Sequence, residues 1–149
     1  MAALQARLTL ASTALTAATA KTVMQLTAPT NQRLKIQAIS IFFDGTSTTG
    51  QPVQYRVLRQ TTAGTMTTQP PVLIEPELTE TIQATGQVNA TVEPTAGAVL
   101  EVGAVHPQTG LTIFYPFGQE IIVGGGGRVG IELNAPAGVN ARGFIHYEE

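Results

Sequence analysis

The sequence predicts an all-β protein, a jelly-roll-like β-sandwich of about eight to ten short antiparallel strands. Thr and Val are used heavily, and their β-branched side chains suit a pleated sheet. Apolar residues mostly recur at every second position, which is the period of a half-buried strand. Fifteen Gly and nine Pro, spread along the 149 residues, mark many turns and leave no convincing long helix.

The length and composition fit one domain that needs no cross-link. Domains cluster near ~100–150 residues, and a chain of this size buries enough surface to hold its own core. There is no Cys, so disulfides, thiolate metal sites and a Cys nucleophile are excluded. Charged residues make up 12% of the chain and the net charge is −2, which argues against an electrostatic nucleic-acid partner.

The first twenty residues allow two interpretations. Residues 7–10 alternate between polar and apolar types, which favours a strand, whereas other apolar positions of the segment fall at helical spacing. Polar residues interrupt the apolar stretch, so we expect no signal peptide, and no stretch reaches the ~18 apolar residues of a transmembrane helix. We expect residues 1–20 to be an N-terminal arm or a first strand, and residues 21–149 to be a single jelly-roll domain.

The strongest strand is predicted over residues 34–43. Its apolar phase switches near Ala38, so either a β-bulge or burial on both faces is expected. Further strands are expected over residues 22–26, 53–57, 72–74, 87–92, 99–105, 111–115, 120–123, 129–133 and 142–147. We expect five residues of these strands to hold the core: Ile36, Ile41, Val57, Ile131 and Phe144.

Two segments are less regular. Residues 60–69 are Thr-rich and nearly uncharged, which predicts a loop. Residues 77–84 could form one or two helical turns, although their Thr content disfavours a helix. Long crossovers such as residues 60–98 favour a jelly roll over an up-and-down barrel.

Four consecutive glycines, Gly124–Gly127, invite comparison with a phosphate-binding loop. Such a loop needs Lys and then Ser or Thr after its last glycine, because the Lys neutralises phosphate and the hydroxyl holds Mg²⁺. Here Arg128 and Val129 follow, and no helix is predicted after them. We therefore expect a connection between strands that needs positive φ.

His106 and His146 are the two histidines and the natural candidates for a metal ligand or a general base. A zinc site needs three or four ligands, and no Cys supplements two distant histidines. A catalytic triad needs an orienting acid, for which Asp44 is the only Asp, while Glu101 and Glu132 lie in alternating strands. We expect His106 to be a turn residue and His146 to face outward from a strand.

The remaining charged groups also point to no site. Glu75, Glu77 and Glu80 are carboxylates that hydrolysis or Ca²⁺ binding would use, but no calcium-loop spacing accompanies them, so a solvated face is expected. Arg56 and Arg59 lie three apart on a strand, hence on opposite faces, and make no basic stripe. We expect no catalytic, cofactor-binding or metal-binding residues, no cofactor and no enzymatic activity.

A low-charge surface rich in Thr, Ala and Val suits burial against other copies, because few charges need to be desolvated. Edge strands with few Lys are poorly protected against pairing with neighbours, which hints that oligomerisation covers them.

Five runs resemble small β-jelly-roll structural proteins of tailed bacteriophages. They are residues 21–33 (KTVMQLTAPTNQR), 41–46 (IFFDGT), 124–131 (GGGGRVGI), 134–140 (NAPAGVN) and 144–149 (FIHYEE). The resemblance covers both ends of the chain and is one of strand and turn pattern, without a catalytic signature.

The resemblance implies a head decoration, or cement, protein of the virion. Such a protein is expected to form a homotrimer, to bind the major capsid protein on the outer surface of the head, and to be made in the host cytoplasm. No direct contact with nucleic acid or membrane is implied. No contact residues carry over, because the matched runs specify the fold and not an interface.

Two other function classes stay open. A receptor- or carbohydrate-binding module of a fibre or tail is disfavoured by the absence of Trp and by only three Tyr, since sugar sites usually present aromatic faces. A cupin-like small enzyme would need clustered His and Glu on neighbouring strands, which two His in unrelated segments fit poorly.

Overall fold

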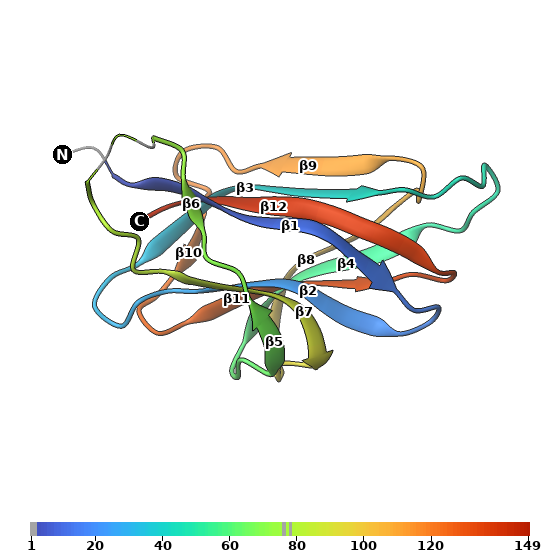
Figure 1. Cartoon of the computed structure of the whole chain (residues 1–149), viewed down its shortest axis with the longest axis horizontal. Coiled ribbons are helices and arrows are strands. Elements are labelled where there is room, and N and C mark those ends of the chain that lie inside the picture. The colour runs from blue at the N-terminus through green and yellow to red at the C-terminus, as the bar shows by residue number, and fades with distance from the viewer. Residues whose placement is uncertain (1–2, 76, 78) are drawn as a thin grey trace.

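The computed structural model describes residues 3–75, 77 and 79–149, and all regular structure in this part is β-strand. The strands described there, twelve in number, form two six-stranded antiparallel sheets packed face to face (Figure 1). Sheet A holds β1 (Gln5–Leu15), β3 (Leu34–Phe43), β6 (Val72–Leu73), β9 (Gly110–Phe114), β10 (Ile121–Val123) and β12 (Val139–Glu148). Sheet B holds β2 (Ala20–Thr27), β4 (Val53–Gln60), β5 (Thr65–Thr68), β7 (Thr85–Val92), β8 (Ala96–Val105) and β11 (Arg128–Asn134).

The strand order gives a jelly-roll topology. Sheet A runs β10-β3-β12-β1-β6, with β9 also paired to β3, and sheet B runs β5-β7-β2-β11-β4-β8. Eight strands form four nested antiparallel pairs: β1 with β12, β2 with β11, β3 with β9, and β4 with β8. Pairing the first strand with the last and working inward describes one long hairpin rolled into two sheets. The predicted all-β sandwich is therefore confirmed, and β5, β6 and β7 are additions between β4 and β8.

Residues 5–15, for which the sequence allowed an arm or a first strand, form β1. This strand pairs with β12 along most of its length and with β6 on its other side. Leu8 is fully buried, and Leu10 and Leu15 are nearly so. Residues 5–15 therefore belong to the sandwich and do not reach out as an arm, while residues 1–2 lie outside the described part of the chain.

The expected loop over residues 60–69 is partly wrong, because residues 65–68 form β5. The side chains of β5 are exposed or half-buried, so no apolar alternation betrays the strand in the sequence. The helical turns considered for residues 77–84 are absent from residues 77 and 79–84, and residue 78 lies outside the described part. The chain has no helix, among the residues described, that is long and apolar enough to cross a membrane.

β3 carries the phase switch that its sequence predicts. The register of β12 along β3 shifts at Gln37, which is the extra residue of a β-bulge. Ile36 precedes the bulge and Ile39 follows it, and both side chains are fully buried in the core. On the opposite phase Ala38 and Ser40 are buried as well. The bulge and the burial on both faces, which the sequence offers as alternatives, are therefore both present.

One apolar core fills the space between the sheets, and most of its side chains are aliphatic. Four of the five expected core residues are at most 1% exposed: Ile36, Ile41, Val57 and Ile131. The fifth expectation, Phe144, is wrong. It alternates with the buried Ile145 along β12 and lies half-buried on the outer face of sheet A.

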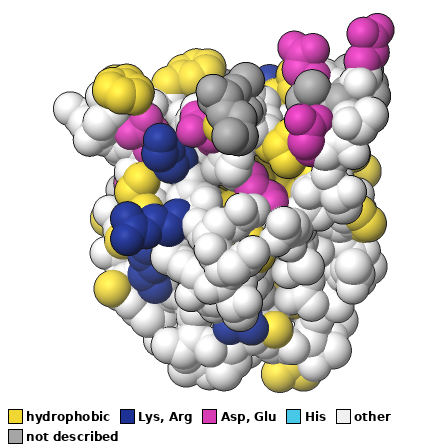
Figure 2. All heavy atoms as spheres, turned by 90° about the vertical axis from the view of Figure 1, so that its left-hand side faces the viewer, with side chains coloured by type: hydrophobic (Ala, Val, Ile, Leu, Met, Phe, Trp, Pro, Cys, Tyr) yellow, Lys and Arg dark blue, Asp and Glu magenta, His cyan; other side chains and the backbone are white. Residues whose placement is uncertain are grey.

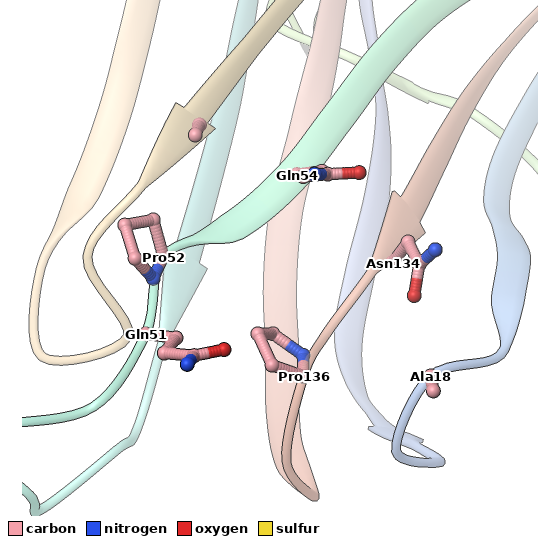
Figure 3. Close-up of a pocket in the computed structure, with 7 residues that line it drawn as sticks. Ala18, Gln51, Pro52, Gln54, Asn134 and Pro136 are labelled. Atoms are coloured by element: carbon pink, nitrogen blue, oxygen red, sulfur yellow. The ribbon is translucent and has the colours of Figure 1, made fainter.

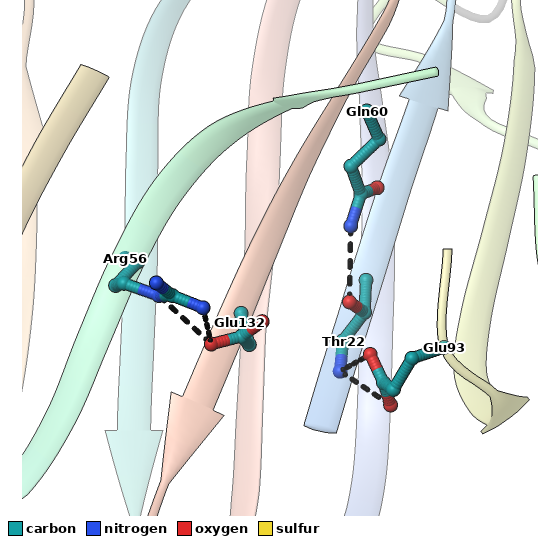
Figure 4. A network of polar contacts seen from close by, with 5 residues as sticks. All are labelled: Thr22, Arg56, Gln60, Glu93 and Glu132. Atoms are coloured by element: carbon teal, nitrogen blue, oxygen red, sulfur yellow. Dashed lines mark hydrogen bonds and ion pairs between the residues drawn. The ribbon is translucent and has the colours of Figure 1, made fainter. Parts of the chain in front are cut away.

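The connection from β7 to β8 begins at Glu93, beside Thr22 of β2, and crosses the outer face of sheet B over a buried polar layer, part of which Figure 4 shows. The Nε2 of Gln25 donates to Gln60 Oε1 at 2.6 Å, and Gln60 Nε2 donates to Thr22 Oγ1 at 3.0 Å. All three residues are at most 5% exposed. At the start of the crossing, both carboxylate oxygens of Glu93 accept the backbone N–H of Thr22, at 2.9 and 3.1 Å. The bonds of Glu93 attach the connection to β2, and the carbonyl oxygen of Thr95, which accepts the N–H of Thr61 at 3.0 Å, attaches it to the end of β4.

Candidate functional site

Four of the five phenylalanines lie outside the core. Phe42 is 42% exposed, Phe114 76% and Phe117 95%, while Phe144 is half-buried. Phe43 is the exception and packs against the core. Exposed phenylalanine is costly in water, so the three exposed rings, with the half-buried Phe144, make this surface a candidate binding site.

Three of these phenylalanines share the outer face of sheet A because of strand alternation. On β3, Ile39 and Ile41 point inward, so Phe42 points outward. On β9, Phe114 is paired with the small Ala38 of β3 and shares its phase. Phe117 follows in the β9–β10 loop. We use the name aromatic face for the surface formed by Phe42, Phe114, Phe117 and Phe144. Figure 2 shows hydrophobic side chains that protrude along the upper edge of the molecule in that view, which is the side of sheet A.

Phe114 and Phe117 line an open hollow of about 390 Å³ at the edge of sheet A. Its other lining residues are Gln37, Tyr115, Pro116 and Glu120. The hydroxyl of Tyr115 donates to Glu101 Oε2 of β8 at 2.7 Å, which ties this edge of sheet A to sheet B. Burial, together with that hydrogen bond, raises the pKa of Tyr115 well above its ordinary value, so the hydroxyl keeps its proton and remains a donor.

Arg7 of β1 completes the polar part of the aromatic face. Its guanidinium carbon lies 4.6 Å from the centre of the Phe144 ring, a cation–π arrangement. Arg7 Nε donates to His146 Nδ1 at 3.2 Å, which leaves the proton of the neutral ring on Nε2, 2.7 Å from Gln5 Oε1. Burial, and then the positive charge of Arg7, lower the pKa of His146. His146 thus faces outward from its strand and orients Arg7 over the ring.

At the other end of the molecule, Asp44 fastens the loop after β3 to β12. Its Oδ2 accepts Asn140 Nδ2 at 2.8 Å, its Oδ1 accepts the backbone N–H of Asn140 at 2.9 Å, and Arg142 lies 3.8 Å away. The side-chain and then the backbone hydrogen bond from Asn140 lower the pKa of Asp44. All of its close partners belong to the fold, so Asp44 acts here as a structural acceptor.

The sequence candidates for catalysis do not converge. His106 lies in the turn between β8 and β9, where its Nδ1 accepts the N–H of Gln108 at 3.2 Å. Glu101 accepts Tyr115, and Glu132 pairs with Arg56 at 2.6 Å on the outer face of sheet B (Figure 4). No three His, Asp or Glu side chains within residues 3–75, 77 and 79–149 are grouped as a metal site would need.

The remaining candidates are surface or turn residues. Glu75, Glu77 and Glu80 lie exposed in the segment between β6 and β7. Arg56 and Arg59 point to different faces, since Arg59 Nη2 donates to the carbonyl oxygen of Ile122 in sheet A at 2.6 Å.

The glycine run Gly124–Gly127 makes the turn between β10 and β11. The N–H of Gly127 donates to the carbonyl oxygen of Gly124 at 2.8 Å, which closes a tight turn. Gly126 has a φ of 73°, in the left-handed region that glycine adopts without strain. The run is thus a strand connection, as its sequence context predicts.

A second hollow, of about 460 Å³, opens at the end of the sandwich where β4 begins (Figure 3). Its lining residues are Ala18, Gln51, Pro52, Gln54, Ala104, Asn134 and Pro136. Amides and small apolar groups make up this set, which holds no acid, base or aromatic ring. It therefore offers neither a proton donor for catalysis nor a stacking surface for a sugar.

Two of the site's features escape the sequence patterns. Phe144 is expected in the core, although it shares a phase with His146, and that shared phase is the signal for its outward position. Phe117 lies in a loop, where alternation says nothing about exposure.

Searches against protein-family models, curated proteins and solved structures found no match to this chain.

Proposed function

We propose that the chain is a non-enzymatic structural protein of a phage virion, a decoration protein that binds the outside of the head. The observation that carries the proposal is the aromatic face. Interfaces are enriched in aromatic residues and Arg and depleted in other charges, and the outer face of sheet A combines Phe42, Phe114 and Phe144 with Arg7.

The energetics favour docking on a large partner. Burial of a phenylalanine side chain is worth ~1.5–3 kcal/mol, so two rings as exposed as Phe114 and Phe117 supply several kcal/mol when covered. The rings are spread over the sheet face, with Phe114 paired with Ala38 and Phe144 paired with Ser40 on β3. Rings spread over a sheet face, beside a hollow that is open and not enclosed, match a broad partner surface better than a small molecule, which is held in a concave site.

Stabilisation of the head follows from mass action. A protein that binds the assembled shell and not its free subunits lowers the free energy of the assembled state. The partner is the major capsid protein, and the chain lies on the outer surface of the virion. The resemblance to decoration proteins of tailed phages selects this partner among large assemblies.

The test is co-sedimentation of the purified chain with heads assembled from the phage or prophage that encodes it. The wild type is expected to sediment with the heads and to raise their unfolding temperature. The double variant Phe114→Ser, Phe117→Ser removes the two most exposed rings and is expected to lose most of this binding. The matched control is Val92→Ser, which removes a 58%-exposed apolar residue of β7 in sheet B.

Three results would contradict the proposal: failure of the wild type to bind heads, equal binding by the double variant, and equal loss of binding in the control. A glycan-array signal that the double variant abolishes would replace the head with a carbohydrate receptor. Circular dichroism of each variant shows whether it is folded, so that lost binding is not mistaken for lost structure.

A further inference from the structure

Arg7 is an exposed arginine of β1 that the fold holds in place without giving it a carboxylate. Its guanidinium carbon lies 4.6 Å from the centre of the Phe144 ring, and its Nε donates to His146 Nδ1 at 3.2 Å. Gln5 Oε1, 2.7 Å from His146 Nε2, fixes the histidine in turn. A side chain oriented in this way loses less conformational entropy when it binds a partner.

Most of the hydrogen-bonding capacity of Arg7 is unused. A guanidinium carries five N–H donors, and His146 accepts the one on Nε. Within residues 3–75, 77 and 79–149, neither Nη1 nor Nη2 has an acceptor, and Arg7 forms no ion pair. The N–H bonds of a guanidinium lie in its own plane, so packing of one face on a ring leaves them accessible.

Two carboxylates at sheet A are already taken by other cations. Glu148 of β12 pairs with Lys35 at 3.4 Å. Asp44, in the loop after β3, lies 3.8 Å from Arg142. An acid that pairs with Arg7 therefore has to come from a partner and not from these two groups.

Arg7 lies in the same row of the sheet as the exposed ring of Phe114. Arg7 of β1 is paired with His146 of β12, His146 with Ala38 of β3, and Ala38 with Phe114 of β9. Figure 1 shows these four strands in that order. At ~4.8 Å from strand to strand, Arg7 and Phe114 are roughly 14 Å apart. A partner surface that covers the rings of Phe114 and Phe144 therefore covers Arg7 as well.

Covering Arg7 requires an anion on the partner. The guanidinium of an arginine does not lose its proton in a protein, so its charge stays when water is excluded. A charge that is removed from water without a partner is strongly unfavourable. A carboxylate satisfies it best, because its two oxygens match two parallel N–H groups of the guanidinium.

We propose that Arg7 binds a carboxylate of the partner, an Asp or Glu side chain of the capsid surface, through the N–H groups of Nη1 and Nη2. The inference rests on the proposed function and deepens it, because it names the chemistry that the partner presents to the aromatic face.

Co-sedimentation of three variants with heads tests the contact. Arg7→Gln removes the guanidinium and is expected to weaken binding roughly tenfold or more. The matched control Arg142→Gln removes the same charge from a side chain that is 58% exposed beside Asp44, and is expected to weaken binding less than about threefold. Arg7→Lys keeps the charge without the planar fork and is expected to recover little of the loss.

Three results would overturn the contact. They are equal binding by Arg7→Gln and the wild type, equal losses for the two glutamine variants, and full binding by Arg7→Lys. Arg7 is exposed, so its variants are expected to keep the fold, which circular dichroism checks.

Chemical neutralisation of the heads tests the identity of the anion. A carbodiimide with glycinamide converts surface carboxylates of the heads into amides. The wild type and Arg142→Gln are expected to bind amidated heads roughly tenfold less tightly, or worse, whereas Arg7→Gln has already lost the pair and is expected to lose much less. Equal losses for all three proteins overturn the proposal, because the acids of the head would then act elsewhere.

The outcomes separate this inference from the proposed function. A wild type that does not sediment with heads contradicts head binding and this contact together. A wild type that binds heads no more tightly than Arg7→Gln leaves head binding standing and rejects the carboxylate contact alone.

Discussion

At the scale of single residues, His146 couples the aromatic face to pH. Its neutral ring accepts Arg7 at Nδ1 and meets Gln5 at Nε2, and burial and then Arg7 lower its pKa from the ordinary 6.5. Below pH 6.5 His146 is protonated in the unfolded chain but still neutral in the folded chain. The free energy of unfolding therefore decreases as the pH decreases. The contribution is complete above pH 6.5 and is lost as pH falls toward the lower, folded-state value.

We expect the wild type to lose more stability than His146→Gln between about pH 7.5 and about pH 5, which brackets the ordinary histidine pKa. Urea unfolding at several pH values measures the difference. The pKa of Asp44 is lowered from 3.8, so this carboxyl group changes its protonation below the pH range of the experiment and does not contribute to the measured difference. Parallel pH profiles for the two proteins would show that His146 is not held neutral by the fold.

Gly143 is a residue whose lack of a side chain the packing requires. It lies in β12 between Leu10 of β1 and Ile41 of β3, and an added Cβ would collide with the backbone carbonyl oxygen of Ser40. Backbone in mid-sheet cannot move aside, so Gly143→Ala is expected to cost ~1–3 kcal/mol or more.

The matched control for Gly143→Ala is Gly138→Ala, five positions earlier in the loop before β12. There the nearest atom to a new Cβ is the carbonyl oxygen of Leu15 at 3.7 Å, an ordinary contact. Alanine at a compatible loop glycine stabilises by ~0.4–1 kcal/mol, because it restricts the unfolded chain. Urea unfolding of both variants is expected to give opposite signs, and equal destabilisation would show that Gly143 is not specially constrained.

At the scale of elements, sequence patterns succeeded where one face of a strand is buried. The apolar alternation of β4 and β11 predicted both strands, and the phase switch in β3 predicted a bulge or burial on both faces, of which the bulge lies at Gln37. The patterns failed at β5, where neither face is buried and Thr occupies both phases. They also failed for Phe144, because hydrophobicity alone does not distinguish a core position from a surface that awaits a partner.

The carboxylate of Glu93 fastens the start of the crossing from β7 to β8. β7 pairs with β2 only from Met24 to Thr27, so Thr22 lies beyond the strand pairing, and the carboxylate of Glu93 accepts its N–H in place of a strand partner. Thr22 is fully buried, and a buried donor without an acceptor costs ~1–3 kcal/mol. Glu93→Ala is expected to lose stability in that range.

Glu93→Gln keeps an acceptor oxygen and is expected to retain part of the stability that Glu93→Ala loses. Hydrogen exchange at the N–H of Thr22 is expected to accelerate in the alanine variant, since its acceptor is gone. The control, Glu80→Ala, changes an exposed glutamate in the segment before β7. Similar losses of stability for Glu80→Ala and Glu93→Ala would argue against a specific role for the carboxylate of Glu93.

At the scale of the whole molecule, the topology joins the two ends of the chain. Leu4 and Glu149 exchange backbone hydrogen bonds at 2.9 and 3.1 Å, and β1 and β12 pair although Gln5 and Glu148 are 143 positions apart. No local pattern reports such a pairing, so the sequence predicted the strands but not their order in the sheets. The aromatic face follows from this strand order and not from any motif.

Distant pairing makes folding slow, because the entropy of closing a long loop must be overcome before the contact forms. A circular permutant that joins Glu149 to Leu4 through a short Gly/Ser linker, with new ends between Thr48 and Thr49, turns β12 and β1 into a hairpin. Its new ends lie in an exposed loop, so we expect the same sandwich by circular dichroism. We also expect refolding roughly tenfold faster or more, since each doubling of a closed loop costs ~0.6 kcal/mol.

Stopped-flow refolding and unfolding measure the two rates separately. If the pairing of β1 with β12 forms in the transition state, the permutant speeds folding and leaves the unfolding rate nearly unchanged. A second permutant, opened between Ala137 and Gly138 with the same linker, keeps the new hairpin and moves the break, so it is expected to fold equally fast. An unchanged folding rate in both permutants would mean that the sandwich nucleates elsewhere, for example in the more local pair of β4 with β8, and that the ends of the chain join last.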